Sequence, residues 1–588
     1  MVTDITPGGQ QALAAIGSGR ASAAEFSLQL LAPMATALLL APAFVASGFS
    51  HMAWFALVPF AWALWVEKGR PELYLGAYYG GVLFHLLGLD WLRTAFSGLV
   101  FDDWVGIAHA AGCFWVLALA VGRRFVPRSR WPMAVSLPVV WLSMEAARHQ
   151  AIALFDGNGF PYLKLGTTLA DCVHLRQVAD VAGVAGTGWL VATVNGALFD
   201  VARHVCRRGR WTEARRTVVL PSLPAALALF AAFVYGVFRL AQAPVETGPV
   251  VALVTGDLKR ATPVDAAAAG TESQVSGAAG IPAGPAVGRP DLFVWHEGAF
   301  DGDLVDGLAA QPTHDDYAAA AARVAARSGV SRVEQFSENL GYLKDLSVCL
   351  DAAVLVGCRR FSVQGSSQQL FNSVAYLLPG GAYQGAYDKR HLAPGIEFIP
   401  RAALAIGVLP RYWADGSADG ERCGFEPGAE NRVFALTSRF DGKRYRFGAN
   451  ICCDAHFPDA HLPLMGRSDP PDFFINVSDE SEDSGVLYHQ SALTNARFRA
   501  IECRRPYLKL SEGGYSAVID SSGRVLLLGH GVGREQRALV AAVPLDGRGT
   551  LYSRLGDWLS PLASVVLLAG LFCPRLSWFP GPRQRRRA

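Results

Sequence analysis

Long apolar runs alternate with short polar connections along the first 240 residues of the chain, and one more run lies near the carboxyl end. The runs occupy residues 28–48, 52–66, 74–92, 104–121, 131–147, 183–200, 218–240 and 558–573. Because a helix of about 20 apolar residues can cross a bilayer core, the pattern predicts a bundle of about eight membrane-spanning helices. The second, fifth and eighth runs are short or contain proline, so a core or interfacial helix is the alternative for each.

The pattern changes between residues 241 and 557, where short apolar runs alternate with helical stretches. The strand-like runs are VVALVTG (250–256), DLFVW (291–295), AAVLVG (352–357), RYRFGANI (444–451), FFINV (473–477) and YSAVIDSSGRVLLL (515–528). Helical spacing is clearest at 315–328, 333–348 and 488–503. Continuous apolar strands between helices are typical of sheets buried on both faces, so we predict an α/β domain with layered helices. Residues 261–290, rich in Ala, Gly, Pro and Ser, are expected to lie outside its core.

Composition agrees with a membrane protein that carries a large polar domain. Hydrophobic residues make up 51% and charged residues 18% of the chain, and the mean hydropathy of +0.24 is high for a soluble protein. The formal net charge of +3 is too small to indicate a nucleic-acid partner. The ten cysteines form no C-x-x-C pair and no zinc-like spacing with histidine, so neither a metal nor another cofactor is expected.

Basic residues gather on alternate connections between the apolar runs and at the carboxyl end. They are Lys68 and Arg70; Arg123, Arg124, Arg128 and Arg130; Arg203, Arg207, Arg208, Arg210, Arg215 and Arg216; and Arg583, Arg585, Arg586 and Arg587. Short basic loops usually stay in the cytoplasm, so both termini are predicted inside and the segment 241–557 outside. The first residues lack the basic and then apolar pattern of a cleaved signal peptide, so the first apolar run is expected to direct membrane insertion.

These patterns divide the chain into five predicted parts. They are a cytoplasmic segment at 1–27, a transmembrane bundle at 28–240, an extracytoplasmic α/β domain at 241–557, a last transmembrane helix at 558–574 and a basic cytoplasmic tail at 575–588.

Three short motifs in the predicted α/β domain carry the residue types of nucleophilic acyl transfer. Glu297 follows the strand DLFVW, Lys389 lies in YDKRHLAPGIEFIP, and Cys452 follows the strand RFGANI. A carboxylate can take the proton of a thiol, and an ammonium can stabilise the oxyanion that forms when the thiolate attacks a carbonyl. Each residue alone also has a simpler explanation: a solvated loop for Glu297, a surface ion pair for Lys389 and small-residue packing for Cys452. The three positions are informative together.

The order of the motifs resembles the carbon-nitrogen hydrolase, or nitrilase, superfamily. The resemblance rests on WHEGAF, NSVAYLLPGGAYQGAYDKRHLAPGIEFIP, GANICCDAHFP, FFINVSDE and ARFRAIECRRPYLKLSEGGYSAVIDSSG. With apolar helices on both sides, the chain is similar to the apolipoprotein N-acyltransferase family. The helical part contributes LAPAFVASGFSHMAWFALVPFAWAL, GFPYLKLG and TLYSRLGDW, so the likeness extends over nearly the whole chain.

This resemblance implies an αββα sandwich on a multi-pass bundle in a bacterial cytoplasmic (inner) membrane, and a ping-pong reaction. Cys452 would take a fatty acyl chain from a phospholipid as a thioester and pass it to the α-amine of a lipoprotein's N-terminal diacylglyceryl-cysteine. By motif position, Glu297 is the expected general base and Lys389 the oxyanion stabiliser. Glu397 and Asp454 are expected as supporting carboxylates. The implied partners are a phospholipid donor, a diacylated lipoprotein acceptor and the bilayer.

Several positions depart from the family pattern where lipid substrates would bind. His296 replaces a proline before the base, Cys453 and Asp454 replace an aromatic residue and a glutamate after the nucleophile, and SDESEDSG replaces an Asn-Asp-aromatic stretch. The excursion 261–290 also lacks a tryptophan that the family often has. These differences bear on which donor and acceptor the protein prefers.

Neighbouring polar residues have two interpretations each. We expect His296 to be a structural neighbour, with a second base as the alternative. Cys453 is expected to be a packed thiol, because the register of strand and turn favours Cys452 as the nucleophile. Arg499 and Glu502 have the i,i+3 spacing of a surface ion pair, with a role in binding a lipid headgroup as the alternative.

Two other functions are compatible with parts of the pattern. A membrane-tethered amidase of the nitrilase type would use the same three residues and release its acyl group to water. A catalytically inactive scaffold or transporter-like protein is the third reading, but the apolar runs contain few of the charges that mark solute pathways. The acyltransferase reading also requires the segment GFPYLKLG at 159–166 to lie near the opening of the catalytic domain.

Overall fold

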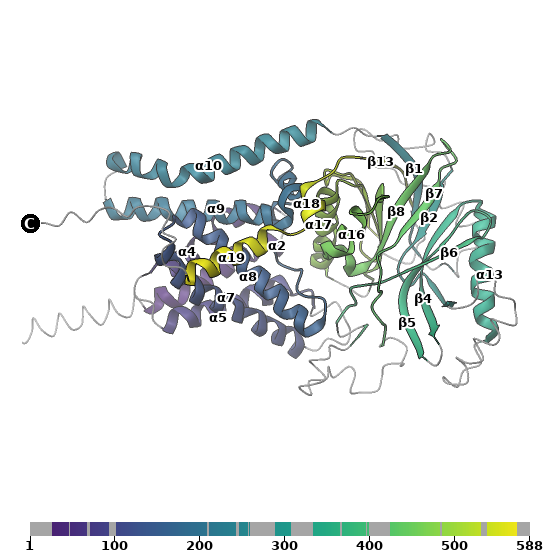
Figure 1. The fold of residues 1–588 in the computed structure, drawn as a ribbon. Coiled ribbons are helices and arrows are strands. Elements are labelled where there is room, and N and C mark those ends of the chain that lie inside the picture. The colour runs from purple at the N-terminus through teal and green to yellow at the C-terminus, as the bar shows by residue number, and fades with distance from the viewer. Residues whose placement is uncertain are drawn as a thin grey trace, which may run out of the picture.

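The structure, a computed structural model, consists of a helical bundle and an α/β part that lie side by side (Figure 1). The predicted helix 315–328 and nearly all of the predicted excursion 261–290 lie outside the residues that it describes. The described residues are 26–45, 48–66, 71–92, 101–208, 211–242, 246–256, 258, 289–306, 333–364, 367–394, 397–398, 424–481, 485–530 and 538–572.

Each apolar run of the sequence contains a helix of the bundle. The first run is helical over Phe26–Val45, which ends in α2 (Pro42–Val45). The second run is divided at Leu57 into two short helices. These two helices are α3 (Ala53–Ala56) and α4 (Val58–Trp65). The remaining helices of the bundle are η1 (Ser50–Met52), α5 (Pro71–Gly88), α7 (Phe101–Ser129), α8 (Met133–Asp156), η2 (Leu165–Leu169), η3 (Leu175–Val178), α9 (Ala179–Arg208), α10 (Trp211–Ala241) and α19 (Leu559–Phe572).

Four helical segments among the described residues are long and apolar enough to span a membrane. They are Phe26–Val45, Trp104–Ser129, Leu175–Cys206 and Ser222–Ala241. The most apolar window of Leu175–Cys206 is 72% buried, whereas that of Ser222–Ala241 is 17% buried, so α9 is central in the bundle and α10 is peripheral. The chain thus has the helices of a membrane protein, and the count of about eight spans stays a prediction.

The α/β part contains two sheets, each with parallel strands at its centre and antiparallel strands at its edges. The seven-stranded sheet has the order β13-β1-β2-β4-β5-β6, with β3 paired to β4, and the six-stranded sheet has the order β12-β11-β10-β9-β8-β7. The strands are β1 (Glu246–Val254), β2 (Leu292–Trp295), β3 (Phe300–Asp306), β4 (Ala353–Gln364), β5 (Ser367–Leu377), β6 (Tyr383–Asp388), β7 (Val433–Thr437), β8 (Arg444–Ile451), β9 (Phe473–Asp479), β10 (Tyr507–Glu512), β11 (Tyr515–Ile519), β12 (Val525–His530) and β13 (Ala538–Leu545).

The two sheets pack face to face, and a helix covers the outer face of each. Apolar side chains of both sheets, among them Val294 and Ile475, form the core between them. α13 (Val333–Leu350) covers the larger sheet and α17 (Val486–Cys503) the smaller one. This arrangement confirms the predicted αββα sandwich. The short elements η4 (Cys452–His456), η5 (Pro458–Ala460), α16 (Leu462–Met465) and α18 (Leu551–Leu555) complete this part.

The run YSAVIDSSGRVLLL forms two strands and a turn. Asp520 accepts hydrogen bonds from the backbone N–H groups of Ser522 and Arg524, and this Asx-type turn joins β11 to β12. The apolar periodicity alone did not separate the two strands, because the turn is only five residues long.

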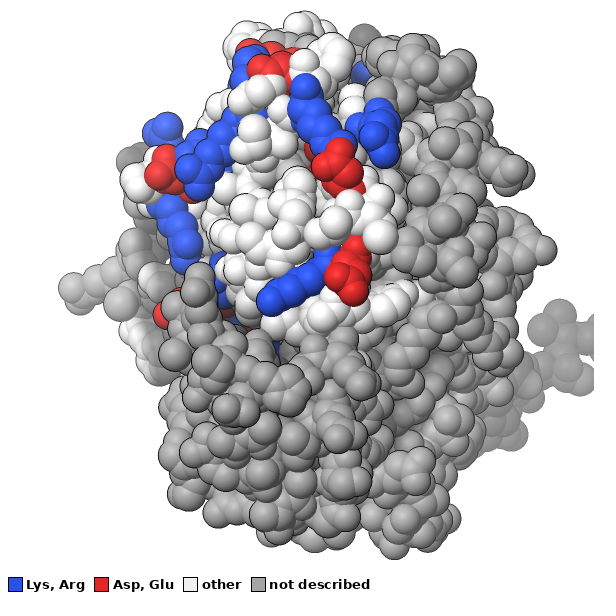
Figure 2. Space-filling model, turned by 90° about the vertical axis from the view of Figure 1, so that its right-hand side faces the viewer, with Lys and Arg blue, Asp and Glu red and all other residues white. Residues whose placement is uncertain are grey.

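The surfaces of the two parts differ as expected for a protein that lies partly in lipid. Exposed large apolar side chains are frequent on bundle helices, as at Leu154, Phe230 and Phe572. The end of the α/β part that faces away from the bundle carries Lys and Arg together with Asp and Glu around uncharged residues (Figure 2). A bilayer around the helices and water around this end would solvate both surfaces.

Buried charged side chains are more frequent in the bundle than its sequence suggested. Arg148 on α8 donates to the ring of His85 at 2.9 Å and to the carbonyl oxygen of Tyr162 at 3.1 Å. Glu145 accepts hydrogen bonds from the N–H of Leu165 at 2.8 Å and from the indole of Trp141 at 2.9 Å. Through these bonds both side chains fix the segment that follows α8.

Candidate active site

Glu297 lies in the turn after β2, where the larger sheet faces the smaller one. A Cβ atom at Gly357 of β4 would lie 2.2 Å from the carbonyl oxygen of His296 and 2.6 Å from the Cα of Glu297. Only glycine therefore lets β4 approach this turn so closely. The backbone N–H of Asp479, at the end of β9, donates to Oε2 of Glu297 at 3.0 Å.

Lys389 lies between two carboxylates. Its Nζ is 3.0 Å from Oε1 of Glu297 and 2.9 Å from Oε2 of Glu397. Asn372 closes the ring, since its amide nitrogen donates to both carboxylates at 2.6 Å. The backbone N–H of Lys389 also donates to the carbonyl oxygen of Asn372 at 2.8 Å, which places the lysine opposite that asparagine beyond the end of β6. Lys389 is 2% exposed, so the ring is buried.

Cys452 is the first residue after β8 and begins η4. Its φ of 47° lies in the left-handed region, which costs a non-glycine residue about 1–2 kcal/mol. The amide of Asn476 donates to the carbonyl oxygen of Cys452 at 3.2 Å and to Oδ1 of Asn450 at 2.7 Å. The side chain of Cys452 is half-buried, so it combines a fixed backbone with access from outside.

The surroundings of Cys452 keep its thiol protonated at rest. Burial alone would lower the pKa of Lys389, but the neighbouring Cys452, Cys453, Glu297 and Glu397 raise it well above its usual value, so the amine is an ammonium. The adjacent Cys453 thiol, burial and the Glu297 carboxylate raise the pKa of Cys452, and Lys389 opposes them. Together these three effects outweigh Lys389, so formation of the thiolate requires a base.

Aromatic side chains from both parts of the molecule enclose the approach to Cys452. The hydroxyl oxygen of Tyr488, in the first turn of α17, is 3.9 Å from Sγ of Cys452. The Tyr488 ring lies 4.7 Å from the ring of Trp91, which follows α5 and lies 5.4 Å from Tyr162. Tyr162 in turn lies 5.1 Å from His456. The predicted proximity of residues 159–166 to the opening of the catalytic domain is confirmed.

Comparisons with known proteins match both parts of the chain. The apolipoprotein N-acyltransferase N-terminal domain family model matches residues 36–197, and the carbon-nitrogen hydrolase family model matches residues 311–551, which includes Lys389 and Cys452. Apolipoprotein N-acyltransferase of Rhodopirellula baltica is 26% identical over 86% of this chain and 90% of its own length. That of Geobacter metallireducens is 26% identical over 91% of this chain and 93% of its own length.

The chain belongs to the apolipoprotein N-acyltransferase family. The model of the N-terminal domain and the relatives along most of the chain carry this assignment, and the two sheets of the α/β part have the carbon-nitrogen hydrolase fold. A solved carbon-nitrogen hydrolase from Helicobacter pylori G27 covers 50% of this chain and 88% of its own length, at 14% identity and a TM-score of 0.32. The family assignment does not depend on that likeness.

Asp454 lies next to the ring around Lys389 and belongs to a separate ionic cluster. One of its oxygens lies 2.8 Å from Nδ1 of His391 and accepts the His391 backbone N–H at 3.0 Å. The other accepts the hydroxyl of Tyr387 at 2.7 Å and the N–H of Ile451 at 3.1 Å. Oδ2 of Asp459 lies 3.1 Å from Nε2 of the His391 imidazole. Because His391 follows Lys389 by two positions and Asp454 follows Cys452 by two, this cluster joins the turns that carry Lys389 and Cys452.

Cys453 and His296 make the contacts expected of structural neighbours of the site. Cys453 is buried, and its thiol donates to the carbonyl oxygen of His391 at 2.9 Å. The ring nitrogens of His296 lie 2.8 Å from the carbonyl oxygen of Glu297 and 3.3 Å from that of Gly256. Both side chains are thus engaged with the backbone, as packed neighbours of the site would be.

The expectation of a surface ion pair between Arg499 and Glu502 is wrong. The pair forms at 2.9 Å, but the two side chains are only 3% and 1% exposed. Glu502 also accepts the backbone N–H of Val184 at 3.2 Å, so α17 packs this face against α9. The helical spacing predicted the pair but not the second domain that covers it.

Three groups of this site were not singled out from the sequence: Asn372, the backbone N–H of Asp479, and Tyr488. Asn372 interrupts the apolar run FNSVAYLL, and a polar residue in a buried strand is a signal that could have found it. The backbone N–H of Asp479 and the position of Tyr488 at the start of an amphipathic helix leave no comparable signal in the sequence. Among the described residues no group of His, Cys, Asp and Glu could hold a metal ion, and none of their eight cysteines forms a disulfide.

Proposed function

We propose that this chain transfers a fatty acyl chain from a phospholipid, through a thioester on Cys452, to the N-terminal α-amine of diacylglyceryl-cysteine lipoproteins. The observation that carries the proposal is the buried ring of Glu297, Lys389, Glu397 and Asn372 beside a half-exposed cysteine that opens toward the membrane bundle. The relatives named apolipoprotein N-acyltransferase, which match both parts of the chain, support the choice of reaction.

In the first half-reaction, Glu297 takes the thiol proton of Cys452 while the sulfur attacks the ester carbonyl of the phospholipid. Negative charge then develops on the carbonyl oxygen, and the Lys389 ammonium stabilises it. The tetrahedral intermediate collapses when the C–O bond breaks, and the protonated Glu297 returns its proton to the leaving glycerol oxygen. The products are a Cys452 thioester and a lysophospholipid.

In the second half-reaction, the α-amine of the acceptor attacks the thioester. Glu297 takes a proton from the attacking nitrogen and delivers it to the departing sulfur, so that the amide forms and the thiol is restored. Glu397 holds Lys389 from the side opposite Glu297, and its Oε2 accepts the Ala393 N–H at 2.7 Å. Its proposed role is to keep the ammonium in place through both half-reactions.

The surroundings of Cys452 favour transfer over the alternative, hydrolysis of a small amide. An amidase needs water at its acyl-enzyme, whereas the Cys452 approach is enclosed by Tyr488, Trp91 and Tyr162. Two of these rings belong to the bundle, so the acyl chain can remain in an apolar environment while it is attached to the sulfur. Exclusion of water from the thioester preserves it until the amine arrives.

The bundle and the basic loops further support a location in the bacterial inner membrane, with the α/β part on the extracytoplasmic side. Two native cysteines that are both exposed test this orientation: Cys206 near the end of α9, and Cys349 on α13. In otherwise cysteine-free chains, a membrane-impermeant maleimide applied to spheroplasts should label Cys349 and not Cys206. The reverse labelling would contradict the proposed topology.

An assay with defined lipids tests the reaction itself. Purified protein is incubated with phosphatidylethanolamine and a synthetic diacylated lipopeptide, and the products are analysed by mass spectrometry. The proposal expects a lipopeptide with one additional amide-linked acyl chain, together with lysophospholipid in equal amount. Release of free fatty acid without modified lipopeptide would favour the hydrolase instead.

A further inference from the structure

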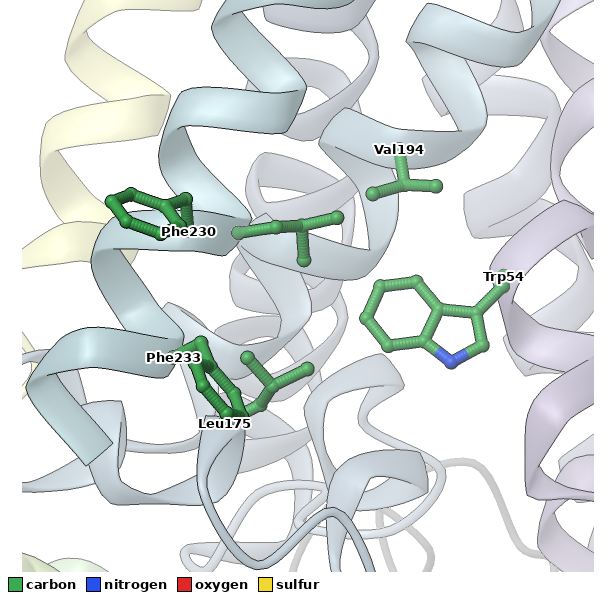
Figure 3. Close-up of a pocket in the computed structure, with 6 residues that line it drawn as sticks. Trp54, Leu175, Val194, Phe230 and Phe233 are labelled. Carbon is green, nitrogen blue, oxygen red and sulfur yellow. The ribbon is translucent and has the colours of Figure 1, made fainter. Parts of the chain in front are cut away.

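An apolar pocket in the bundle lies apart from the catalytic residues. Its volume is about 490 Å³, and it is lined by Trp54, Leu175, Val194, Leu229, Phe230 and Phe233. These residues come from α3, η3, α9 and α10, whereas the residues around Cys452 come from α17, the segment after α5 and the segment after α8. Figure 3 shows Phe230 and Phe233 on one side of the pocket and Trp54 and Val194 on the other.

The helix that forms the outer wall has little protein around it. In α10 the window that could span a membrane is only 17% buried, and Phe230 and Phe233 are 67% and 46% exposed. The pocket therefore continues into the apolar surface that α10 presents to its surroundings. In a bilayer those surroundings are hydrocarbon chains, because no water is present to fill such a space.

The pocket is open toward its surroundings, and apolar walls left without a neighbour there would be costly. Protein interiors are close-packed, and atoms that line a void lose their dispersion contacts on that side. The walls carry no charged side chain, so the pocket suits hydrocarbon rather than a polar ligand. Trp54 and Leu175 are half-buried and rigidly placed by the bundle core, so the inner wall is preformed.

Polar groups lie at one end of the pocket and suggest how a lipid would be oriented. The ring of His174, just before η3, lies 4.8 Å from that of Phe233. Six residues after Phe233, about two turns or 9 Å along the helix, Arg239 donates to Asp180 at 2.7 Å, and Asp180 also accepts from Tyr235 at 2.7 Å. A headgroup at this end and an acyl chain toward Phe230 would match both environments.

We propose that this pocket binds one acyl chain of a resident bilayer phospholipid that is not a substrate. The lipid fills the space between α3 and α10. Its consequence is structural: α10 leads directly into β1, and the lipid completes the packing on the side of α10 that protein leaves open. The occupant is a phospholipid of the surrounding membrane, distinct from the donor that reaches Cys452.

Photocrosslinking in nanodiscs tests this binding site. The full-length protein is reconstituted with a phosphatidylcholine that carries a diazirine on one acyl chain, and labelled peptides are mapped by mass spectrometry. We expect labelling concentrated on η3 and on the part of α10 that contains Leu229, Phe230 and Phe233. A diether phosphatidylcholine, which has no ester to donate, should compete with the label.

Substitutions that fill the pocket provide the matched comparison. Val194→Trp should reduce this labelling at least five-fold, and Leu229→Trp on the opposite wall should do the same if the first variant folds poorly. Leu198→Trp is the control, because Leu198 is one turn further along α9, is 43% exposed and does not line the pocket. Cys452→Ala should leave the labelling unchanged.

Three results would overturn the proposal. They are even labelling along the exposed side of α10, equal loss of label in Leu198→Trp, and crosslinks that join two copies of the chain in place of lipid. A diether lipid that fails to compete would likewise overturn it, because the label would then not report a specific lipid site. Because none of these readouts uses acyl transfer, their outcome is independent of the proposed activity.

Discussion

Two regions join the α/β part to the bundle, and they differ in chemistry. On one side, Arg504 at the end of α17 donates to Asp180 of α9 at 2.8 and 3.0 Å, and both side chains are 1% exposed or less. Arg176 donates to the carbonyl oxygen of Ser522 at 3.2 Å on the same side. On the other side, the ring of Tyr488 at the start of α17 contacts the ring of Trp91 of the bundle, directly beside Cys452.

The difference indicates that the two ends of α17 have different roles. Buried ion pairs have strict geometry and leave costly charges behind when broken, so the end of α17 at Asp180 attaches the two parts. Aromatic rings tolerate small displacements and exclude water, so the start of α17 can admit a lipid chain. The comparison predicts that substitutions beside Tyr488 reduce catalysis without loss of stability, and that substitutions beside Asp180 do the opposite.

The largest expected effect is at the nucleophile. Cys452→Ala should abolish acyl transfer with an unchanged unfolding temperature, because the substitution removes the only atom that can form the thioester. Cys453→Ala should keep most of the activity, because that thiol is buried and donates to the backbone carbonyl of His391. Both variants are compared by turnover and by thermal unfolding in detergent. Activity in the first variant but not in the second would move the nucleophile by one residue.

The next effect is at the oxyanion stabiliser. Lys389→Ala should slow turnover by about 10²–10³, or roughly 3–4 kcal/mol, as expected when one oxyanion donor is removed. Glu297→Gln should prevent activation of a thiol whose pKa is raised by the adjacent Cys453, by burial and by Glu297 itself. Single-turnover acylation measures both. Full activity of Glu297→Gln would require another base, with His296 the first to examine.

On the attachment side, Asp180→Ala should lower the free energy of unfolding by about 3–5 kcal/mol, since it leaves Arg504 and Arg239 buried without their partner. Asp171→Ala is the control, because its bond to Arg497 lies on the surface, where a pair contributes about 1 kcal/mol or less. Equal melting temperatures for the two variants would contradict the assignment of Asp180 as the attachment point.

The smallest expected effect concerns pH and the cluster that joins the turns that carry Lys389 and Cys452. Burial opposes protonation of His391, but its bonds to Asp454 and Asp459 raise its pKa from 6.5 to about 9. A raised pKa means that the stabilisation is complete below pH 6.5 and is lost as the pH rises through about 9. The loss amounts to about 3 kcal/mol at 1.36 kcal/mol per pKa unit.

His391→Gln tests this dependence. The variant should unfold with a midpoint that changes less between pH 6.5 and 9.5 than that of the unmodified protein. Arg390 lies beside Asp459 and donates to its carbonyl oxygen at 3.0 Å, so Arg390→Gln serves as the control for a general loss of positive charge there. An unchanged pH profile in His391→Gln would show that the cluster does not titrate in this range.

Local sequence patterns predicted the elements well and the contacts between them less well. The strand RYRFGANI coincides with β8, and Cys452 follows it directly, because a continuous apolar strand and its end are local features. Glu297, Lys389 and Glu397 meet as their motif positions suggested, although their roles stay proposals. The bridge through Asn372 joins residues that are 75 and 25 positions away from it, and no local periodicity reports such a distance.

The interface between the two parts was the least predictable region. Arg499, Glu502 and Arg504 have the composition of a solvated helix end, and their burial follows only from the position of α9 against α17. In the sequence Tyr488 resembles the other apolar residues of an amphipathic helix. Only its contact with Cys452 of η4 distinguishes it. Both cases depend on how the bundle and the sandwich meet, which neither segment encodes by itself.

Intact-mass analysis after incubation with phosphatidylethanolamine, in the absence of acceptor, tests the central claim most directly. The account predicts a mass increase of one fatty acyl group that hydroxylamine removes, that Cys452→Ser prevents, and that a diacylated lipopeptide discharges with formation of an amide. A protein that shows no acyl-enzyme and releases fatty acid steadily, or that cleaves a small soluble amide while never accepting an acyl chain from phospholipid, would contradict it.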